Sequence, residues 1–417
     1  MVAIDTFVSA GTGSPAAAPA ASRGRGAVTN VSHRYQRDSR LADPDALDHA
    51  LALDELPPAP LTRVEAEQAR RLISRNDSPD LPFEQAVNPY RGCEHGCIYC
   101  YARPTHAYLG YSPGLDFETR LVAKTNAVEA LRAELSRPGY VPKTITLSSA
   151  TDAYQPIERH WQLSRGILAL MLETGHPVSV ITKNALVERD LDLLVPLAQR
   201  RLVQVYLSLP TLDADMARTL EPRASAPWRR LRTLRVLADA GVPAGVSLAP
   251  VIPFINDDQI EQVLHAAAQA GASQAFYTVL RLPYEVKDVF EQWLHTHFPD
   301  RAQRVLHRIE DLREGRRNDS RFGVRMRGTG IWADLIAQRF ALAVRQAGLN
   351  LRDLGDLDTS AFVAPARAVK PSAAGAASPG AASAQLDLFS VPDLAVSGPA
   401  VSSSHRQPHA AGAATPT

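Results

Sequence analysis

The feature that most constrains the fold is a structural unit that repeats between about residues 84 and 348. In each repeat, a short apolar and β-branched run precedes a stretch with apolar residues at three- and four-residue spacing. These are the patterns of a buried strand and of an amphipathic helix. The predicted strands are Ala86–Tyr90, Thr144–Ser148, Val178–Thr182, Val203–Leu209, Ala244–Val251 and Ala275–Leu280. Such alternation predicts an α/β fold in which helices cover a parallel sheet.

Polar residues follow the predicted strands at their carboxyl ends. They are Cys93, Ser148, Ser149, Thr151, Asp152, Lys183, Ser208, Asn256, Asp257 and Arg281. In βα barrels the carboxyl ends of the strands meet at one rim, and this rim carries the chemistry. Strand ends are usually solvated, so loop polarity alone accounts for part of the set. We therefore expect the functional site at this rim, built from some of these residues.

All cysteines of the chain lie in the nine-residue stretch Gly92–Cys100 (GCEHGCIYC). They are Cys93, Cys97 and Cys100, in the spacing CxxxCxxC. A structural zinc site takes four ligands, and disulfides need an even number of cysteines. Three thiolates so close together suit a [4Fe–4S] cluster bound at three irons and open at the fourth, and Gly92 and Gly96 would let the backbone turn tightly around it. Zinc held by these cysteines and His95 or His106 is the alternative.

The cysteine spacing, with Tyr99 directly before the last cysteine, resembles the signature of the radical S-adenosylmethionine (radical SAM) superfamily. The resemblance implies a partial (β/α)6 barrel that is open on one side. It also implies that the open iron chelates the methionine end of S-adenosylmethionine (SAM), with Tyr99 beside the adenine. Reduction of the cluster would then cleave SAM to methionine and a 5′-deoxyadenosyl radical, and the cofactor would carry this chemistry.

Further segments resemble the DNA-repair-photolyase-like branch of this superfamily, which includes spore photoproduct lyase. They are LSSATDAYQPIE (Leu147–Glu158), ITKN (Ile181–Asn184), the run Tyr206–Asp213, LEPRA (Leu220–Ala224), APVIPFIND (Ala249–Asp257) and LRLP (Leu280–Pro283). The cysteine loop and its continuation resemble a bacterial subgroup of that branch. Because these segments stand in order at successive strand ends, the resemblance is more specific than the cysteines alone.

The resemblance implies a set of SAM contacts besides Tyr99. Ser149 would meet the amino acid moiety, Lys183 would face the carboxylate as a point charge, and Ser208 would bond the ribose or the carboxylate. Arg223 is a further candidate anion partner. Asp152, Glu158 and Tyr154, by contrast, are interpreted as structural residues of the loops.

One departure from the branch concerns the return of a hydrogen atom to the substrate radical. Spore photoproduct lyase uses a cysteine near the end of the second strand for this step. Here the corresponding residues are Leu147, Ser148 and Ser149, and a serine O–H bond is too strong to replace a thiol. We therefore do not expect repair of spore photoproduct by that relay, and we assign no catalytic residue. Tyr99, Tyr101 and Tyr108 are either alternative donors or packing residues.

The substrate is constrained only weakly. The formal net charge of +1 does not demand nucleic acid, but the basic segments Arg229–Arg235 and Arg316–Arg327 could contact phosphates. Gln385–Phe389 (QLDLF) resembles the peptide by which bacterial repair proteins dock on the DNA sliding clamp, a mode that suits a flexible tether. DNA repair or modification is therefore the favoured function. The alternatives are a protein or small-molecule substrate, or a clamp-tethered iron–sulfur redox sensor.

Composition and patterning divide the chain into three parts. Residues 61–350 are predicted to form the radical SAM core with a helical extension, because 45% hydrophobic residues in 417 can bury one large core. Residues 1–60 and 351–417 are rich in Ala, Ser, Pro and Gly and are predicted to be disordered. Without an apolar span or an export signal, we expect a cytoplasmic protein. It would need an external electron donor of the flavodoxin or ferredoxin type.

Overall fold

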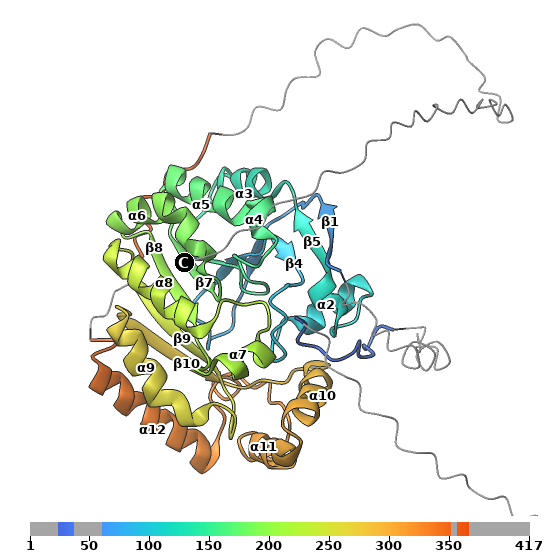
Figure 1. Cartoon of the computed structure of the whole chain (residues 1–417). Helices are drawn as coiled ribbons and strands as arrows, with labels where there is room; N and C mark the ends of the chain where they lie inside the picture. The colour runs from blue at the N-terminus through green and yellow to red at the C-terminus, as the bar shows by residue number, and fades with distance from the viewer. Residues whose placement is uncertain (1–23, 37–60, 352–356, 367–417) are drawn as a thin grey trace, which may run out of the picture. The chain divides into compact units, whose positions relative to one another are not determined.

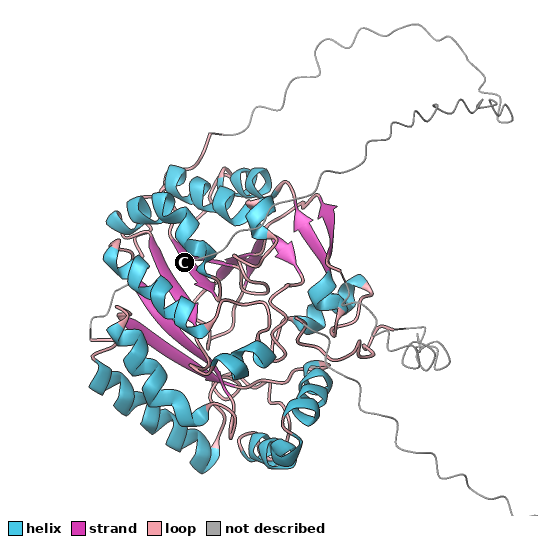
Figure 2. Ribbon diagram, in the orientation of Figure 1, coloured by secondary structure: helices cyan, strands magenta, loops and turns pink. Residues whose placement is uncertain are grey.

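The computed structural model describes residues 24–36, 61–351 and 357–366. A seven-stranded sheet with the order β10-β9-β8-β7-β6-β3-β2 lies at the centre of this part (Figures 1 and 2). All neighbours from β3 to β10 are parallel, and β2 pairs with β3 in the antiparallel direction. Its strands are β2 (Ile73–Arg75), β3 (Gln85–Val87), β6 (Ile145–Leu147), β7 (Val178–Thr182), β8 (Val203–Ser208), β9 (Ala244–Val251) and β10 (Gln274–Val279). The predicted partial barrel of six parallel strands is confirmed.

Helices cover the outer face of this sheet, as Figure 1 shows. The covering helices are α3 (Ala127–Leu135), α5 (Leu163–Thr174), α6 (Leu191–Gln199), α8 (Pro227–Asp239), α9 (Ile260–Gln269) and α12 (Gly330–Ala347). Shorter or peripheral helices are η1 (Arg103–Leu109), α2 (Asp116–Thr119), α4 (Glu158–Trp161), η2 (Ala185–Asp190), α7 (Ala214–Leu220), η3 (Asp257–Gln259), α10 (Val286–His297) and α11 (Pro299–Asp311). A continuous apolar core fills the space between the sheet and the covering helices, and it includes the fully buried Val180, Val205 and Val246.

The first predicted strand is divided in the structure. β3 ends at Val87, and the chain then continues as β4 (Tyr90–Arg91) in a second sheet with the order β1-β5-β4, where β1 is Arg63–Glu67 and β5 is Arg120–Lys124. Pro89 lies between the two strands. Because proline cannot donate a hydrogen bond to a neighbouring strand, it accounts for the division. Its carbonyl still accepts from the Lys124 N–H at 2.9 Å. The small sheet positions the start of the cysteine loop, which follows β4 directly. The sequence pattern did not predict β1, β2 or β5.

Gly175 caps α5, and Gly241 and Gly271 directly follow the C-caps of α8 and α9; all three have positive φ. At Gly175 a Cβ would lie 2.3 Å from the carbonyl oxygen of Ala361. Residues 357–366 therefore approach the end of α5 closely. They are fastened there because Val363 N–H donates to Thr174 O at 2.8 Å and Asp358 N–H donates to Arg201 O at 3.0 Å.

Residues 24–36 and 357–366 lie in the stretches predicted to be disordered, 1–60 and 351–417, but both pack against the core. Glu118 accepts hydrogen bonds from the N–H groups of Gly26 at 3.0 Å and Ala27 at 2.9 Å. Gly26 lies so close to the cysteine loop that a Cβ would clash with Gly96 O. This segment has few apolar side chains, so its sequence does not suggest an ordered structure. Backbone hydrogen bonds hold it instead, and the lack of a side chain at Gly26 permits its close approach to the cysteine loop. The rest of 1–60, and Gln385–Phe389 in the tail, lie outside the described residues.

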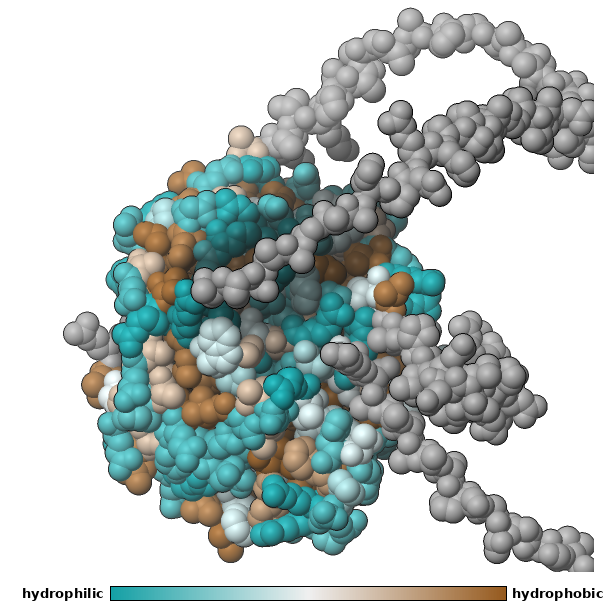
Figure 3. All heavy atoms as spheres, viewed as in Figure 1, coloured by the Kyte–Doolittle hydropathy of each residue, from teal (hydrophilic) through white to brown (hydrophobic). Residues whose placement is uncertain are grey.

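On the face drawn in Figure 3, hydrophobic residues form scattered patches between hydrophilic ones. The helices thus turn mixed outer faces away from the core, as amphipathic helices do. Within the described residues, none of the helices combines the length and the apolar character that a membrane crossing requires.

Candidate metal and cofactor site

The three cysteines lie in a tightly wound loop between β4 and η1, at the carboxyl end of the sheet. Cys93 and Cys97 are buried, and Cys100 is partly exposed. Gly92 and Gly96 have φ values of 72° and 68°, so both positions need the left-handed conformation that glycine adopts without strain. A Cβ at Gly96 would also meet the Glu118 carboxylate at 2.8 Å. The predicted role of these glycines in winding the loop is supported by both observations.

Arg103 holds the loop from behind. Its Nε donates to Cys97 O at 2.9 Å and its Nη2 donates to Gly96 O at 3.0 Å, while Nη1 donates to Pro113 O and Gly114 O, each at 2.9 Å. The same guanidinium forms a completely buried ion pair with Glu118. Carbonyl groups of the loop are thus bonded on its protein side.

The amide side of the loop is less completely bonded. Cys93, Glu94 and Ile98 donate their N–H groups to Phe117 O, Gln155 Oε1 and Leu220 O respectively. The N–H groups of His95, Cys97 and Tyr99 have no acceptor in the described part of the chain. Free amides next to thiolates are what the sulfurs of an iron–sulfur cluster require as donors. The loop therefore fits the group that its cysteines predict.

The surroundings of the thiols hold them in the protonated form, so binding of a metal group would release their protons. Burial raises the pKa of Cys97 and of Cys100, and the neighbouring thiols raise both further, whereas Lys183 acts in the opposite direction. Among the described residues, no three His, Cys, Asp or Glu side chains converge on one metal-ion position. The ligands of an iron–sulfur cube each bind a different iron, so they need not converge on one point.

Both candidate imidazoles are bonded to protein groups. The His95 Nδ1 lies 3.3 Å from Asp152 Oδ2, and its Nε2 lies 3.3 Å from the Asn184 amide nitrogen. Asn184 Oδ1 accepts from the Leu186 N–H at 3.0 Å, which fixes the amide orientation and makes its nitrogen a donor to His95. Burial alone would lower the pKa of His95, but the Asp152 carboxylate and Cys93 raise it overall to about 9. His106 Nε2 lies 2.9 Å from Arg120 O, and burial lowers the pKa of His106 to about 4.

Asp152 organises the end of β6 and β7, as the sequence interpretation expected. Its carboxylate accepts from Thr182 Oγ1 at 2.7 Å and from the N–H groups of Tyr154 and Lys183, each at 2.9 Å. Glu158 is equally enclosed, since it accepts from Tyr90 Oη and forms an ion pair with Arg189 at 2.8 Å. These carboxylates hold the loops from which the candidate SAM contacts project.

Lys183 and Tyr99 lie together beside the cysteines. The Lys183 ammonium is 6.0 Å from the centre of the Tyr99 ring. Burial alone would lower the pKa of Lys183, but the Cys97 thiolate and the Glu221 and Asp152 carboxylates raise it overall. Among the described residues, no carboxylate lies within ion-pair distance of this ammonium. A cation in this position can bind an incoming anion.

A second buried ion pair supports Tyr99. Its hydroxyl donates to Glu221, which is also paired with Arg230, and the side chains of that pair are 1% and 0% exposed. Arg230 further donates to Ser208 O at 2.8 Å. The adjacent Arg223 lies against the cysteine loop, because its N–H donates to His95 O at 3.3 Å and its guanidinium lies 3.2 Å from Glu94.

Ser149 and Ser208 occupy the ends of β6 and β8, as predicted. Ser149 is partly exposed, and its hydroxyl accepts from the Asn88 amide at 3.3 Å. Ser208 is buried, and its hydroxyl points to Ala249 O at the longer distance of 3.4 Å. The structure thus brings Tyr99, Lys183 and Arg223 directly to the cysteine loop.

Sequence reasoning missed the buried charged residues that support the loop. Arg103, Glu118, Glu221 and Arg230 are all at most 2% exposed. A usable signal was present only for Arg103, which follows the last cysteine closely in the run CYARP. Glu221 and Arg230 lie in two segments considered above, Leu220–Ala224 and Arg229–Arg235, but nothing in their spacing showed that these two side chains pair.

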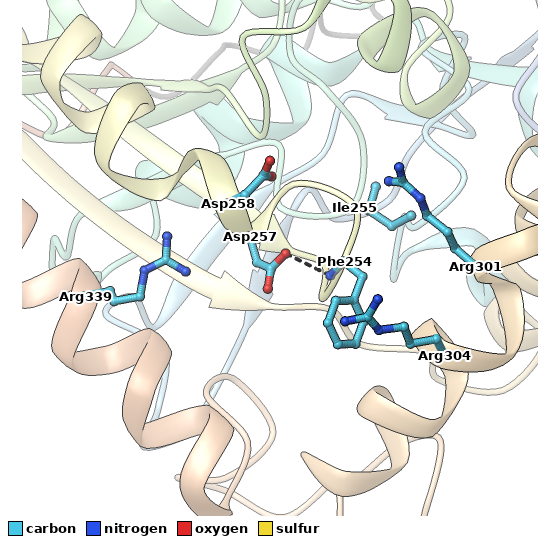
Figure 4. A pocket seen from close by; sticks show the side chains of 7 residues that line it. All are labelled: Phe254, Ile255, Asp257, Asp258, Arg301, Arg304 and Arg339. Carbon is cyan, nitrogen blue, oxygen red and sulfur yellow. Dashed lines mark hydrogen bonds between the residues drawn. The ribbon is translucent and has the colours of Figure 1, made fainter.

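Figure 4 shows a separate hollow of about 390 Å³ beyond the end of β9. Arg301 and Arg304 enter it from α11, Arg339 from α12, Asp257 from η3 and Phe254 from the loop between β9 and η3. The Arg304 guanidinium lies 3.9 Å from the centre of the Phe254 ring. Burial raises the pKa of Asp257, whose carboxylate accepts from the Phe254 N–H at 2.8 Å. Carboxylates and guanidinium groups are mixed here, and the cysteines do not line this hollow.

Residues 87–267 match the family model described as the radical SAM superfamily. Over 226 residues the chain is 39% identical to an uncharacterised protein of Mycobacterium tuberculosis (strain ATCC 25618 / H37Rv). The aligned residues are 54% of this chain and 66% of that protein. The match therefore spans slightly less than two thirds of that relative. An uncharacterised protein of Methanocaldococcus jannaschii is 26% identical over 233 residues, or 56% of this chain and 83% of that protein.

Among solved structures, the chain is similar to spore photoproduct lyase complexed with dinucleoside spore photoproduct. The TM-score is 0.49 with 17% identity, over 69% of this chain and 80% of the other. It is also similar to TYW1 with a lysine-pyruvate adduct bound, with a TM-score of 0.30 and 14% identity, over 56% of this chain and 76% of the other.

Proposed function

Because residues 87–267 match the radical SAM superfamily model, we propose that this chain is a radical SAM enzyme that abstracts hydrogen from nucleic acid by means of a 5′-deoxyadenosyl radical. Cys93, Cys97 and Cys100 would hold a [4Fe–4S] cluster, with SAM at the open iron. When bound, the cluster supplies one electron, taken from an external flavodoxin or ferredoxin, which splits the sulfonium of SAM into methionine and that radical. Abstraction of one hydrogen atom from a substrate C–H bond would convert this radical to 5′-deoxyadenosine.

The observation that supports this proposal best is the grouping of the cysteine loop with Tyr99 and Lys183. The loop offers three thiols and three amides without an acceptor in the described residues, which together suit a cluster. Lys183 has a raised pKa and stays charged, so it can bind the carboxylate of an amino acid moiety.

The remaining candidate contacts have graded support. Arg223 is 37% exposed in its side chain, so it can turn from Glu94 toward an anion. Ser149 is partly exposed at the end of β6 and can bond a polar group of SAM. Ser208 is buried next to Ala249 O, so it reaches a ligand only if that long bond is exchanged. We therefore rank Lys183 first, Arg223 and Ser149 next and Ser208 last.

The source of a returning hydrogen atom stays open. All three cysteines are assigned to the cluster, and Ser148 and Ser149 replace a thiol at the end of β6. Tyr99 donates its hydroxyl proton to Glu221 in a buried position, which favours packing over hydrogen-atom transfer. The Tyr101 hydroxyl also donates, to Ser149 O, but Tyr101 is half exposed and is therefore the better candidate among the tyrosines.

Nucleic acid as substrate is tested by labelled hydrogen. Reconstituted, reduced protein would be given SAM with damaged or undamaged perdeuterated DNA, and deuterium would be followed into 5′-deoxyadenosine. Transfer of deuterium from DNA supports the proposal. Cleavage of SAM without transfer from any DNA would favour a protein or small-molecule substrate. A fully loaded cluster that yields no 5′-deoxyadenosine would favour a redox sensor.

The clamp partner rests on the sequence of Gln385–Phe389 alone and stays a prediction. A glutamine with spaced Leu and Phe anchors suits insertion into a preformed apolar pocket. The double variant Leu388→Ala with Phe389→Ala should abolish co-elution with the sliding clamp. Unchanged co-elution would remove this partner.

A further inference from the structure

Three exposed tyrosines gather around one arginine at the edge of the candidate site. Tyr35, Tyr108 and Tyr284 are 52%, 67% and 65% exposed. The Arg34 guanidinium carbon lies 5.0, 5.6 and 4.1 Å from the centres of these rings, in that order. The Tyr35 and Tyr108 rings are 5.5 Å apart and inclined by 35°. We call the three rings the tyrosine rim.

The tyrosine rim borders the same end of the sheet as the cysteines. Tyr108 belongs to η1, which directly follows the cysteine loop, and Tyr284 follows the carboxyl end of β10. A further contact joins these two segments, because the Arg281 guanidinium lies 5.6 Å from the centre of the Tyr101 ring. Tyr35 completes the rim from the N-terminal segment 24–36.

The rim is not an open cage for a cationic ligand, although aromatic rings around a cation often form one. Arg34 occupies the space between the rings, and its Nη1 donates to both oxygens of Glu285, at 3.2 and 3.0 Å. The Arg34 N–H also donates to Glu285 at 3.2 Å. The rings are thus held by an anchored side chain of the protein. Their outward faces are exposed and suit a flat, uncharged partner.

Arg281 lies three residues before Tyr284, and its charge is offset only from a distance by Asp80, which is itself paired with Arg325. Among the described residues, no carboxylate lies within ion-pair distance of this guanidinium. Its Nη1 reaches only the Met326 sulfur at 3.6 Å, and its buried Nε has no partner in the described structure. Arg313 nearby is 1% exposed and donates only to the carbonyl oxygens of Val324 and Leu280, at 3.0 and 2.8 Å.

Arg313 is enclosed and adds positive charge beside Arg281, so the pair favours an anion at Arg281. Burial lowers the pKa of Arg281, and it lowers that of Arg313 to about 10. A buried charge is costly unless an opposite charge meets it. Phosphate fits a guanidinium through paired N–H donors better than it fits an ammonium. The rim and Arg281 together therefore offer flat stacking faces beside an anion-binding group.

We propose that the tyrosine rim stacks unpaired bases of a single-stranded nucleic acid while Arg281 binds a phosphate of the same strand. This inference rests on the proposed function and specifies the form of its substrate. Stacking on aromatic rings combined with basic contacts to the backbone is how proteins bind single strands without reading sequence. A duplex keeps its base faces covered, so it cannot use the rim.

The test measures binding of a fluorescent oligodeoxynucleotide of about 12 nucleotides, a length within the usual range of single-strand sites. The variant Tyr35→Ala/Tyr108→Ala/Tyr284→Ala should raise Kd at least about tenfold, since each stacked base contributes substantially. The triple exchange of the same residues to Phe keeps the ring faces and should stay within about twofold of wild type. Trp228→Ala removes a 62% exposed ring on α8 and is the matched control.

A salt titration tests the role of Arg281. In Arg281→Gln, the slope of log K against log salt should decrease in magnitude by about 0.7, the value for one lost phosphate contact on a single strand. An Ala triple that binds as wild type does, a Phe triple as weak as the Ala triple, or a duplex bound as tightly as the single strand would each overturn the inference.

The two proposals fail in different ways. Reductive SAM cleavage without oligonucleotide is measured on the same proteins and should not change in the rim variants, and circular dichroism melting verifies their folding. Wild type that cleaves SAM but does not bind the single strand overturns this inference alone. Wild type that binds the strand but does not cleave SAM contradicts the proposed chemistry.

Discussion

The two ends of the barrel are built in different ways. At the carboxyl end, buried charged side chains surround the cysteine loop, and Arg103–Glu118 and Arg230–Glu221 are enclosed ion pairs. At the amino end, the rings of Tyr140, His176 and Phe362 pack together with centres 5.3 to 5.8 Å apart. Residues 357–366 cover this end.

The difference shows where the molecule gives up stability for function. Polar groups at the amino end satisfy one another, since the Tyr140 hydroxyl lies 2.8 Å from His176 Nε2 and the His176 Nδ1 lies 3.0 Å from Pro177 O. The carboxyl end instead keeps three thiols, an unpaired Lys183 and free loop amides within the described structure. Changes at the carboxyl end should therefore affect chemistry first, and changes at the amino end should affect stability alone.

The largest effect is expected for the cysteines. Cys93→Ala, Cys97→Ala and Cys100→Ala should each abolish cluster binding and SAM cleavage, because three ligands are the whole protein contribution to the cluster. Iron and sulfide content and 5′-deoxyadenosine formation are the measurements. The thermal unfolding of each apo variant should remain close to that of apo wild type. A single variant that retains a full cluster and activity would remove its cysteine from the ligand set.

Arg103→Met should affect both chemistry and stability. It leaves Glu118 buried without its charged partner, with the N–H groups of Gly26 and Ala27 still donating to it, which costs about 3–5 kcal/mol in the free energy of unfolding. The loop also loses the donors to Cys97 O and Gly96 O, so iron loading should fall. Urea unfolding and iron content measure the two effects. Arg132→Met, at a half-exposed ion pair with Glu173, is the control and should cost less than about 1 kcal/mol.

Lys183→Met should weaken SAM binding without unfolding the protein. A lost charge-assisted bond of about 1.5–3 kcal/mol corresponds to a rise of roughly 10- to 100-fold in the KM for SAM. Lys143→Met is the matched control, because Lys143 pairs with the exposed Glu84 away from the cysteines. Steady-state kinetics of 5′-deoxyadenosine formation give both values. An unchanged KM in Lys183→Met would show that SAM binds elsewhere at the carboxyl end of the sheet.

The smallest effect concerns pH at the amino end. Burial lowers the pKa of His176 to about 4 from its ordinary value near 6.5. Below pH 6.5 the unfolded chain binds a proton that the folded protein excludes, so stability is complete above this value and decreases as pH falls toward 4. Between pH 7 and pH 5 this residue should cost about 2 kcal/mol.

His176→Gln provides the comparison, because glutamine does not titrate. Its free energy of unfolding should decrease less than that of wild type between pH 7 and pH 5, as measured by urea denaturation. SAM cleavage at pH 7 should be the same in both proteins. An equal pH dependence of the two would assign the effect to other groups, and lost activity would contradict the separation of the two ends.

Sequence patterns predicted the parts of the molecule whose signals are local. β7 and β9 have the expected bounds because their apolar runs are continuous and end in turns. The carboxyl-end position of the cysteines follows from the order of strands and loops. Segments held by distant partners could not be predicted. β1 and β5 pair although they are 57 residues apart, as Arg63 and Arg120 show.

The candidate site divides in the same way. Cys93, Lys183 and Tyr99 were identified from short motifs, and the structure places them together. Arg103 and Glu118 were not identified, because charged residues that form a buried ion pair look the same in a sequence as charged residues on the surface. The tyrosine rim combines residues from three segments, and only the folded chain shows that Tyr35 and Tyr284 meet around Arg34.

The most direct test of the account is the anaerobic reconstitution of the full chain, followed by reduction in the presence of SAM. The account predicts about four iron and four sulfide per chain, bound through the three cysteines. It also predicts formation of 5′-deoxyadenosine that depends on the reductant. A protein that takes up zinc instead of the cluster, and leaves SAM intact after reduction, would contradict it.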